Sequence, residues 1–352
     1  MKKPIAKIMK PSVFDEDATG FVWINDVQFK PIMWLWDGYI PKGGIVLIEG
    51  NPGEGKSHLT SFLAACVSAG NPLPDGVEIE PRTVIIVNGE DPAGIQAIRI
   101  QAAGGDLKRV LLWPDPEAAY KAFHLPQGID VLKKLATKHN VGLIVIDPLN
   151  AHLDPKLKIY NDQDMKLVLQ QLNKLAQDLN IPIIAVRHLK KAQMGSAIVS
   201  GLGSIGIIGS ARAAFIVGPD PDGSGDKILA CSKMNFGPKP TSLRFQIVSA
   251  TVKSDDGEDI PTSKIEWLGE SSYTADDLCK PDKASLSTAV AEAVEFLKEL
   301  LADGGLLPKL VFDEAEEAGI SEATVKRAKK PAGVKSTKTA SGWLWELLKT
   351  KE

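Results

Sequence analysis

The chain has 352 residues, of which 44% are hydrophobic and 24% are charged, and these fractions are ordinary for a soluble globular protein. The length accommodates a core domain of roughly 200–250 residues and a smaller one. The net charge of −3 excludes a protein that attracts nucleic acid through its overall charge, so any basic surface must be local. The sequence contains no apolar run of membrane-spanning length.

The cysteines and the N-terminus indicate a cytoplasmic protein. Cys66, Cys231 and Cys279 are scattered and form neither a metal-binding spacing nor an even disulfide set, so we interpret them as reduced thiols. The first residues, MKKPIAKIMKP, include lysines but no apolar stretch, and they do not predict a signal peptide. We therefore expect a cytoplasmic protein without a membrane partner.

A predicted strand, residues 45–49, leads directly into the sequence GNPGEGKS. The spacing G-x-x-x-x-G-K-S is that of a phosphate-binding loop (P-loop, residues 50–57). Its glycines let backbone N–H groups point at phosphate oxygens, and a predicted helix at 56–69 adds its positive N-terminal end. Lys56 would reach the β- and γ-phosphates of ATP, and the Ser57 hydroxyl would bind Mg²⁺. The predicted nucleotide contacts are Gly50, Asn51, Pro52, Gly53, Glu54, Gly55, Lys56, Ser57 and His58.

Further strands and helices alternate along the chain. Apolar runs at 83–87, 141–146 and 181–186 predict strands that are buried on both faces, and the three-and-four spacing of apolar residues in 165–179 predicts a helix. This pattern is typical of an α/β fold with a mostly parallel central sheet that is covered on both sides. Three later runs, 214–217, 227–231 and 243–248, predict an antiparallel extension of the sheet.

The C-terminal part has a different pattern. Residues 252–284 are rich in turn-forming and acidic residues and predict turns and a linker. Helices are predicted at 285–302 and 307–318, and a third after the N-cap Ser321. The short connection between the last two, followed by two short strands, predicts a winged helix-turn-helix. We expect a tail at 1–19, a nucleotide-binding domain at 20–270, a linker at 271–284 and a winged-helix domain at 285–352.

Polar residues follow several predicted strands at their carboxyl ends, where ligands bind in α/β sheets. Asp147 is placed to hold Mg²⁺. Glu90 is placed to orient or deprotonate an attacking water molecule, and His188 to contact the γ-phosphate. Two alternatives remain open, because Asp91 also fits a helix N-cap and His188 also fits a structural histidine.

These segments together resemble a known family. GNPGEGKS, VIIVNGEDP, LIVIDPL, AVRHLKKA and CSKMNFGP are similar to motifs of the RecA-like ATPases of the RepA type, a group of hexameric helicases encoded by plasmids, phages and integrated elements. The resemblance covers about residues 20–270. The end of the chain resembles the winged helix that many element-encoded members carry.

The resemblance implies a RecA-like core that hydrolyses ATP at the interfaces of a hexameric ring, with single-stranded DNA in the channel. Lys56 and Ser57 would then hold phosphate and Mg²⁺, Asp147 would be the Walker B residue, Glu90 the catalytic carboxylate and His188 the switch. The segment 190–212 would couple the switch to DNA, with Lys190 and Lys191 among its DNA contacts.

One motif departs from the related replicative helicases. Those proteins carry a Lys-x-Arg pair, and both cations reach the γ-phosphate of the neighbouring subunit. Here Lys233 matches the lysine, but Asn235 stands at the arginine position. Either Arg212 supplies the second cation, or hydrolysis is slower.

The C-terminal segment carries local positive charge. Residues 323–351 contain eight Lys or Arg against one acidic residue, Glu346. Such charge on a recognition helix is where a winged helix meets phosphates, although a winged helix can also dock a protein. The sequence thus supports a DNA-dependent ATPase of helicase type or, alternatively, an ATP-gated regulatory or loading adaptor that does not unwind DNA. The predicted DNA contacts in this segment are Lys326, Arg327, Lys329 and Lys330.

Overall fold

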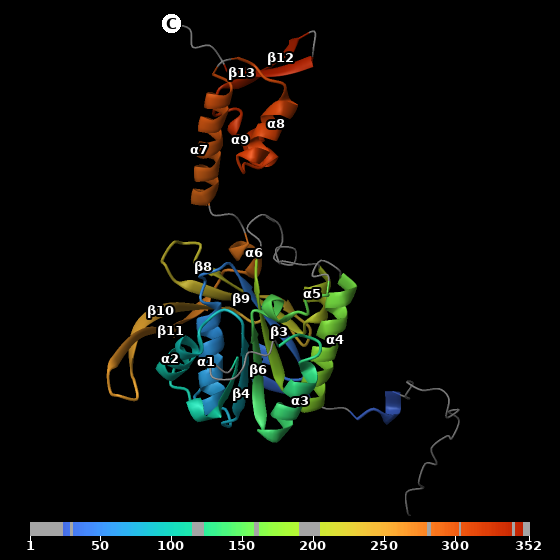
Figure 1. Ribbon diagram of the computed structural model, residues 1–352, viewed down its shortest axis with the longest axis vertical. Helices are drawn as coiled ribbons and strands as arrows, with labels where there is room; N and C mark the ends of the chain where they lie inside the picture. The colour runs from blue at the N-terminus through green and yellow to red at the C-terminus, as the bar shows by residue number, and fades with distance from the viewer. Residues whose placement is uncertain are drawn as a thin grey trace, which may run out of the picture.

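The computed structural model describes residues 24–28, 31–114, 123–157, 162–189, 205–279, 283–302, 304–339 and 342–347. A nine-stranded sheet dominates this part of the chain, with the order β11-β10-β9-β8-β3-β7-β6-β4-β5 (Figure 1). The strands are β3 (Gly44–Gly50), β4 (Thr83–Asn88), β5 (Val110–Trp113), β6 (Val141–Asp147), β7 (Pro182–His188), β8 (Ala213–Pro219), β9 (Lys227–Met234), β10 (Ser242–Lys253) and β11 (Asp259–Ser271).

The strands from β8 to β5 in this order are parallel, whereas β9, β10 and β11 are antiparallel to their neighbours. The predicted α/β fold with a mostly parallel sheet is therefore confirmed. Because side chains alternate along a strand, Val46 and Ile48 pack into one apolar cluster while Ile45 and Leu47 pack into another on the opposite face.

Helices cover both faces. On one face lie α1 (Lys56–Ala69) and α2 (Ala93–Ala102), and on the other α3 (Ile129–Lys138), α4 (Asp162–Leu179) and α5 (Ile205–Ser210) (Figure 1). The short elements are the 3₁₀ turns η1 (Ile24–Asp26), η2 (Leu107–Arg109) and η3 (Leu149–His152), the strands β1 (Trp34–Trp36) and β2 (Ile40–Pro41), and the helix α6 (Ala275–Leu278).

Some predictions about the sheet were wrong. The run 214–217 lies in β8, which is parallel to β3 and not part of the antiparallel extension. The stretch predicted as turns and linker contains β11, a strand of 13 residues that forms a long hairpin with β10. Its acidic turn was interpreted correctly as a turn, but this turn joins two strands and does not separate two domains.

The C-terminal elements have an apolar cluster of their own. They are α7 (Lys283–Leu300), α8 (Pro308–Glu317), α9 (Glu322–Ala328), β12 (Val334–Thr339) and β13 (Gly342–Leu347). The N-cap prediction is confirmed, since the Ser321 side chain accepts a hydrogen bond from the Thr324 amide. Among the described residues, no helix combines the length and the apolar character needed to cross a bilayer.

The thiols agree with the sequence-based interpretation. Cys66, Cys231 and Cys279 are free, and the first two are buried. Burial raises the pKa of Cys66 to about 12 and that of Cys231 to about 11. Both side chains are therefore protonated and unreactive at neutral pH.

Candidate functional site

The P-loop joins the carboxyl end of β3 to the first turn of α1. Gly55 precedes the helix with a φ of 91°, a left-handed conformation that favours glycine. A Cβ on Gly50 would lie 2.3 Å from the Val217 carbonyl oxygen, and one on Gly55 would lie 2.8 Å from Ile247 Cδ1. The loop is thus packed between β8 and the β10–β11 hairpin, with no room for side chains at these positions.

Lys56 is buried at the base of this loop. Its Nζ donates a hydrogen bond to the Asn51 carbonyl oxygen over 2.8 Å. Burial lowers the pKa of Lys56, while the carboxylates of Asp147, Glu90 and Glu54 act in the opposite direction. The ammonium group therefore lies where it can contact a phosphate at the head of α1.

Asp147 ends β6, in register with Asn88 of β4. The Ser57 hydroxyl hydrogen-bonds to its carboxylate, and burial raises the pKa of Asp147 to about 6. Its Oδ2 is buried without a hydrogen-bond partner in the part of the chain that the structure describes. A hydroxyl and a buried carboxylate beside a phosphate loop fit Mg²⁺, which proteins bind through one or two carboxylates and the phosphates of the substrate.

Glu90 and His188 meet at the mouth of the cavity. His188 ends β7 in register with Gly50, and its Nε2 lies 3.0 Å from Glu90 Oε1. Both residues line a cavity of about 500 Å³ together with Lys56 and Ser57. The carboxyl ends of β3, β4, β6 and β7 thus bring together the predicted phosphate, metal, carboxylate and histidine positions.

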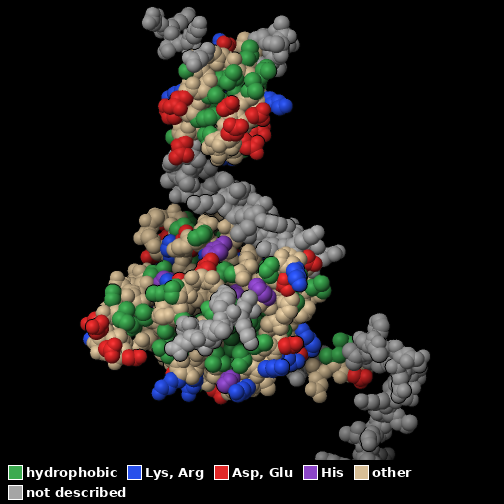
Figure 2. All heavy atoms as spheres, viewed as in Figure 1, with side chains coloured by type: hydrophobic (Ala, Val, Ile, Leu, Met, Phe, Trp, Pro, Cys, Tyr) green, Lys and Arg blue, Asp and Glu red, His purple; other side chains and the backbone are tan. Residues whose placement is uncertain are grey.

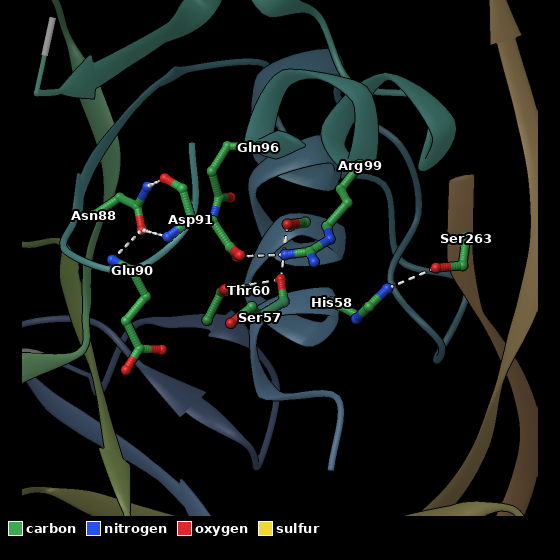
Figure 3. Close-up of polar contacts among 10 residues, drawn as sticks. Ser57, His58, Thr60, Asn88, Glu90, Asp91, Gln96, Arg99 and Ser263 are labelled. Carbon is green, nitrogen blue, oxygen red and sulfur yellow. Dashed lines mark hydrogen bonds and ion pairs between the residues drawn. The ribbon is translucent and has the colours of Figure 1, made fainter. Parts of the chain in front are cut away.

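Sequence reasoning missed Arg99, which lines the same cavity. Arg99 Nη1 forms an ion pair with Asp91 Oδ2 at 2.5 Å, and Gln96 Nε2 lies 3.3 Å from the same oxygen (Figure 3). The N-cap prediction for Asp91 was wrong, because Pro92 occupies that position. The available signal was the spacing of Gln96 and Arg99, which places both on one face of α2.

Two predicted nucleotide contacts are engaged with the antiparallel part of the sheet. The Glu54 carboxylate lies 2.7 Å from Lys227 Nζ of β9. His58 Nε2 lies 2.8 Å from the Ser263 hydroxyl of β11 (Figure 3). These contacts fix the outer side of the P-loop to β9 and to the hairpin.

Lys233 and Arg212 lie at the opposite edge of the sheet from the P-loop. Arg212 contacts Gly44, where β3 begins, and Lys233 is in register with Ala214 at the start of β8. The length of β3 separates them from the P-loop by roughly 20 Å. Lys233 Nζ donates to the carbonyl oxygens at positions 208 and 209, at the end of α5, over 2.8 Å each. Neither cation can reach the cavity of its own chain.

The predicted DNA contacts differ in their surroundings. Lys190 and Lys191 lie outside the described residues. In the C-terminal part, Lys326 pairs with Glu322 at 2.6 Å. Lys329 donates to the Ser336 hydroxyl at 2.6 Å and lies 4.2 Å from the centre of the Trp345 ring. Arg327 and Lys330 are exposed.

The comparison with known families places the chain. A family model described as "AAA domain" matches residues 10–194, more than half of the chain. The chain belongs to this AAA domain family. The matched range contains the P-loop, Glu90, Asp147 and His188, and membership of the AAA domain family supports ATP hydrolysis.

Solved structures of low sequence identity share similarity with this AAA domain protein. The ATPase domain of a DnaB-like helicase is 14% identical, with 57% of this chain and 81% of that chain covered and a TM-score of 0.45. The RadB recombinase is 16% identical, with 59% and 89% covered and a TM-score of 0.43. No curated protein matches the chain significantly.

Asp147 gives the site a cost in stability that can be measured. Its pKa rises from 3.8 to about 6 on burial, so the folded state binds more protons than the unfolded state between these values, and stability falls as the pH rises through them. We expect Asp147→Asn to be more stable than wild type by about 1–3 kcal/mol near pH 8, in urea unfolding without ATP and Mg²⁺. The gain should vanish near pH 4. Equal stability of the two proteins at both pH values would contradict this assignment.

Proposed function

We propose that the protein is an ATP-hydrolysing, ring-forming motor of the RepA-like helicase type that acts on DNA. The observation that carries the proposal is the distribution of polar groups over two edges of one sheet. The P-loop, Glu90, Asp147 and His188 form the site at the carboxyl edge, whereas Lys233 lies at the far edge. In a head-to-tail ring, one edge of a subunit faces the other edge of its neighbour.

In this proposal ATP binds with its phosphates on the P-loop amides and Lys56. Ser57 and Asp147 would hold Mg²⁺, which when bound neutralises charge on the β- and γ-phosphates. Glu90 accepts a proton from the attacking water, and its contact with His188 links the hydrolysis step to the end of β7. The segment after His188, including Lys190 and Lys191, is proposed to contact single-stranded DNA.

The domain division and the winged helix are also proposals. The short connection between α8 and α9 and the antiparallel pair β12–β13 support a winged helix. Its cluster, which includes Leu297, Val311 and Val325, is separate from the clusters of the sheet. We propose a tail at 1–19, a RecA-like domain at 20–270, a linker at 271–284 and the winged helix at 285–352.

The test measures the ATPase rate with and without single-stranded DNA, together with the native mass. The proposal expects an assembly of several subunits, a hexamer in the simplest case, and a rate that DNA increases. Neutralising Lys190 and Lys191 should reduce this stimulation and leave the basal rate unchanged. A monomer with a rate that ignores DNA would exclude the motor.

A second function, an ATP-gated adaptor without unwinding activity, is favoured by the charge of the C-terminal part. On the face seen in Figure 2, acidic side chains gather over the C-terminal helices. Two of the four predicted DNA-binding cations are already paired within the chain, as described above for Lys326 and Lys329. Strand displacement on a forked DNA substrate separates the two functions. The exposed acids are Glu292, Glu295, Glu299, Asp313, Glu314, Glu316, Glu317 and Glu322.

The exposed cations Arg327 and Lys330 provide the sharper test of DNA binding by this part. If they contact phosphates, Arg327→Ala with Lys330→Ala should weaken single-stranded DNA binding, and the salt dependence of log K should become shallower by about 0.7 per lost contact. The measurement is a salt titration by fluorescence anisotropy. Lys298→Ala on α7, which removes an exposed lysine that pairs with Glu295, is the matched control. An unchanged slope would indicate a protein-docking domain.

A further inference from the structure

A buried ion pair joins the strand that carries the P-loop to the strand that carries His188. Glu49 of β3 and Arg187 of β7 are in register, and each comes one residue before a position of the site, Gly50 and His188 respectively. Glu49 Oε1 lies 3.4 Å from Arg187 Nη1, and both side chains are 0% exposed. The pair lies at the end of two central strands, immediately behind the nucleotide cavity.

The surroundings make this pair a poor stabilising element. Burial raises the pKa of Glu49 and lowers that of Arg187, and the charge of each residue opposes the shift of the other. In the described part of the chain, neither Glu49 oxygen accepts a hydrogen bond. A buried pair of this kind is often no more stabilising than apolar residues of similar size, because both charges lose their hydration. A contribution to stability alone therefore does not explain the pair.

The geometry offers a different role. Along the same face of β3 and β7 the neighbours are apolar, with Ile45 and Leu47 on one strand and Ile183 and Ala185 on the other. Apolar contacts tolerate small sliding movements, whereas two opposite charges in a low-dielectric interior favour one separation strongly. The ion pair thus fixes the end of β7 against the end of β3.

We propose that Glu49 and Arg187 are positioning residues that hold His188 in place beside the P-loop. Neither side chain lines the cavity, so they act through His188, whose Nε2 lies 3.0 Å from Glu90 Oε1. The Leu189 amide also donates to the Gly50 carbonyl oxygen over 3.2 Å, which ties the residue after β7 to the loop. This inference rests on the proposed ATPase function.

The test removes both charges at once, in Glu49→Gln with Arg187→Met, so that no unpaired charge remains buried. The double variant should keep its melting temperature and bind ATP with an affinity within about threefold of wild type, while kcat falls roughly 10–100-fold, as expected when a catalytic contact is misplaced. In a His188→Ala background the same double change should cause no further loss of kcat, because the pair acts through that histidine.

The control is an exposed pair on the hairpin, Lys253 and Asp259, which lie 2.7 Å apart. Lys253→Met with Asp259→Asn should leave kcat unchanged. If the double core variant does not fold, Arg187→Lys keeps the charge but alters its position, and we then expect a lower kcat at unchanged KM.

Three outcomes would overturn the inference: an unchanged kcat in the core variants, a loss confined to KM, or a full additional loss of kcat in the His188→Ala background. The proposed function is tested separately by the wild type. If the wild type hydrolyses ATP and His188→Ala slows it, the ATPase proposal stands whatever the ion pair does.

Discussion

Glu90→Gln should lower the rate of ATP hydrolysis by about 10²–10⁴-fold, the range for the loss of a general base, while ATP affinity stays close to that of wild type. The amide is similar in size to the carboxylate but cannot accept a proton from water. Glu90 Oε1 lies 3.0 Å from His188 and lines the cavity, so the carboxylate is in position for this role. Single-turnover hydrolysis and binding of a fluorescent ATP analogue measure the two quantities.

Asp91 is the competing carboxylate and provides the control. Its Oδ2 is held by Arg99 at 2.5 Å, which leaves it less available to water than Glu90. Asp91→Asn should therefore retain most of the turnover and alter ATP affinity through Arg99. Full turnover in Glu90→Gln with a large loss in Asp91→Asn would exchange the two roles.

Lys233→Ala should abolish turnover while ATP still binds, because Lys233 is proposed to act on the nucleotide of the neighbouring subunit. Within its own chain Lys233 holds the end of α5 and lies at the sheet edge far from the P-loop. Burial lowers its pKa, with Arg212 acting in the same direction. The ATPase rate should also rise more steeply than linearly with protein concentration as rings assemble.

Complementation separates this role from a structural role within one chain. Lys56→Ala weakens ATP binding in its own subunit but keeps Lys233, and Lys233→Ala keeps the P-loop. When these two inactive variants are mixed in equal amounts and assembled, roughly a quarter of the interfaces combine an intact P-loop with an intact Lys233, and activity should return accordingly. If the mixture stays inactive while native mass shows mixed rings, Lys233 acts within its own chain.

The part of the site that follows central strands could be predicted from the sequence. The strands that end at Asp147 and His188 are apolar on both faces, so their polar residues stand out as the first after a buried run. Parallel strands then bring these residues to one edge of the sheet. No further information was needed to expect them near Lys56.

The residues that were missed depend on tertiary contacts. In β11, Ile265 and Trp267 alternate with polar residues, but Pro261 and Gly269 interrupt the pattern, and most of the strand pairs with β10 alone. Its strand character therefore comes from pairing with β10 and not from local propensity. The same reason hides Ser263 as the partner of His58, and Glu54 cannot be matched to Lys227 without knowing that β9 lies beside β8.

The two sides of the nucleotide cavity differ in stiffness. Glu90 and His188 come from strands in the middle of the sheet, whereas Ile247 and Ser263 come from the β10–β11 hairpin, of which only three residues, 243–245, pair with β9. A two-stranded ribbon bends and twists more readily than a broad sheet. Bulky synthetic groups attached to the nucleotide on the hairpin side should therefore be accommodated, while added bulk at the γ-phosphate should be rejected. The protein would then accept base- or sugar-labelled ATP as a chemical probe far more readily than phosphate-labelled ATP.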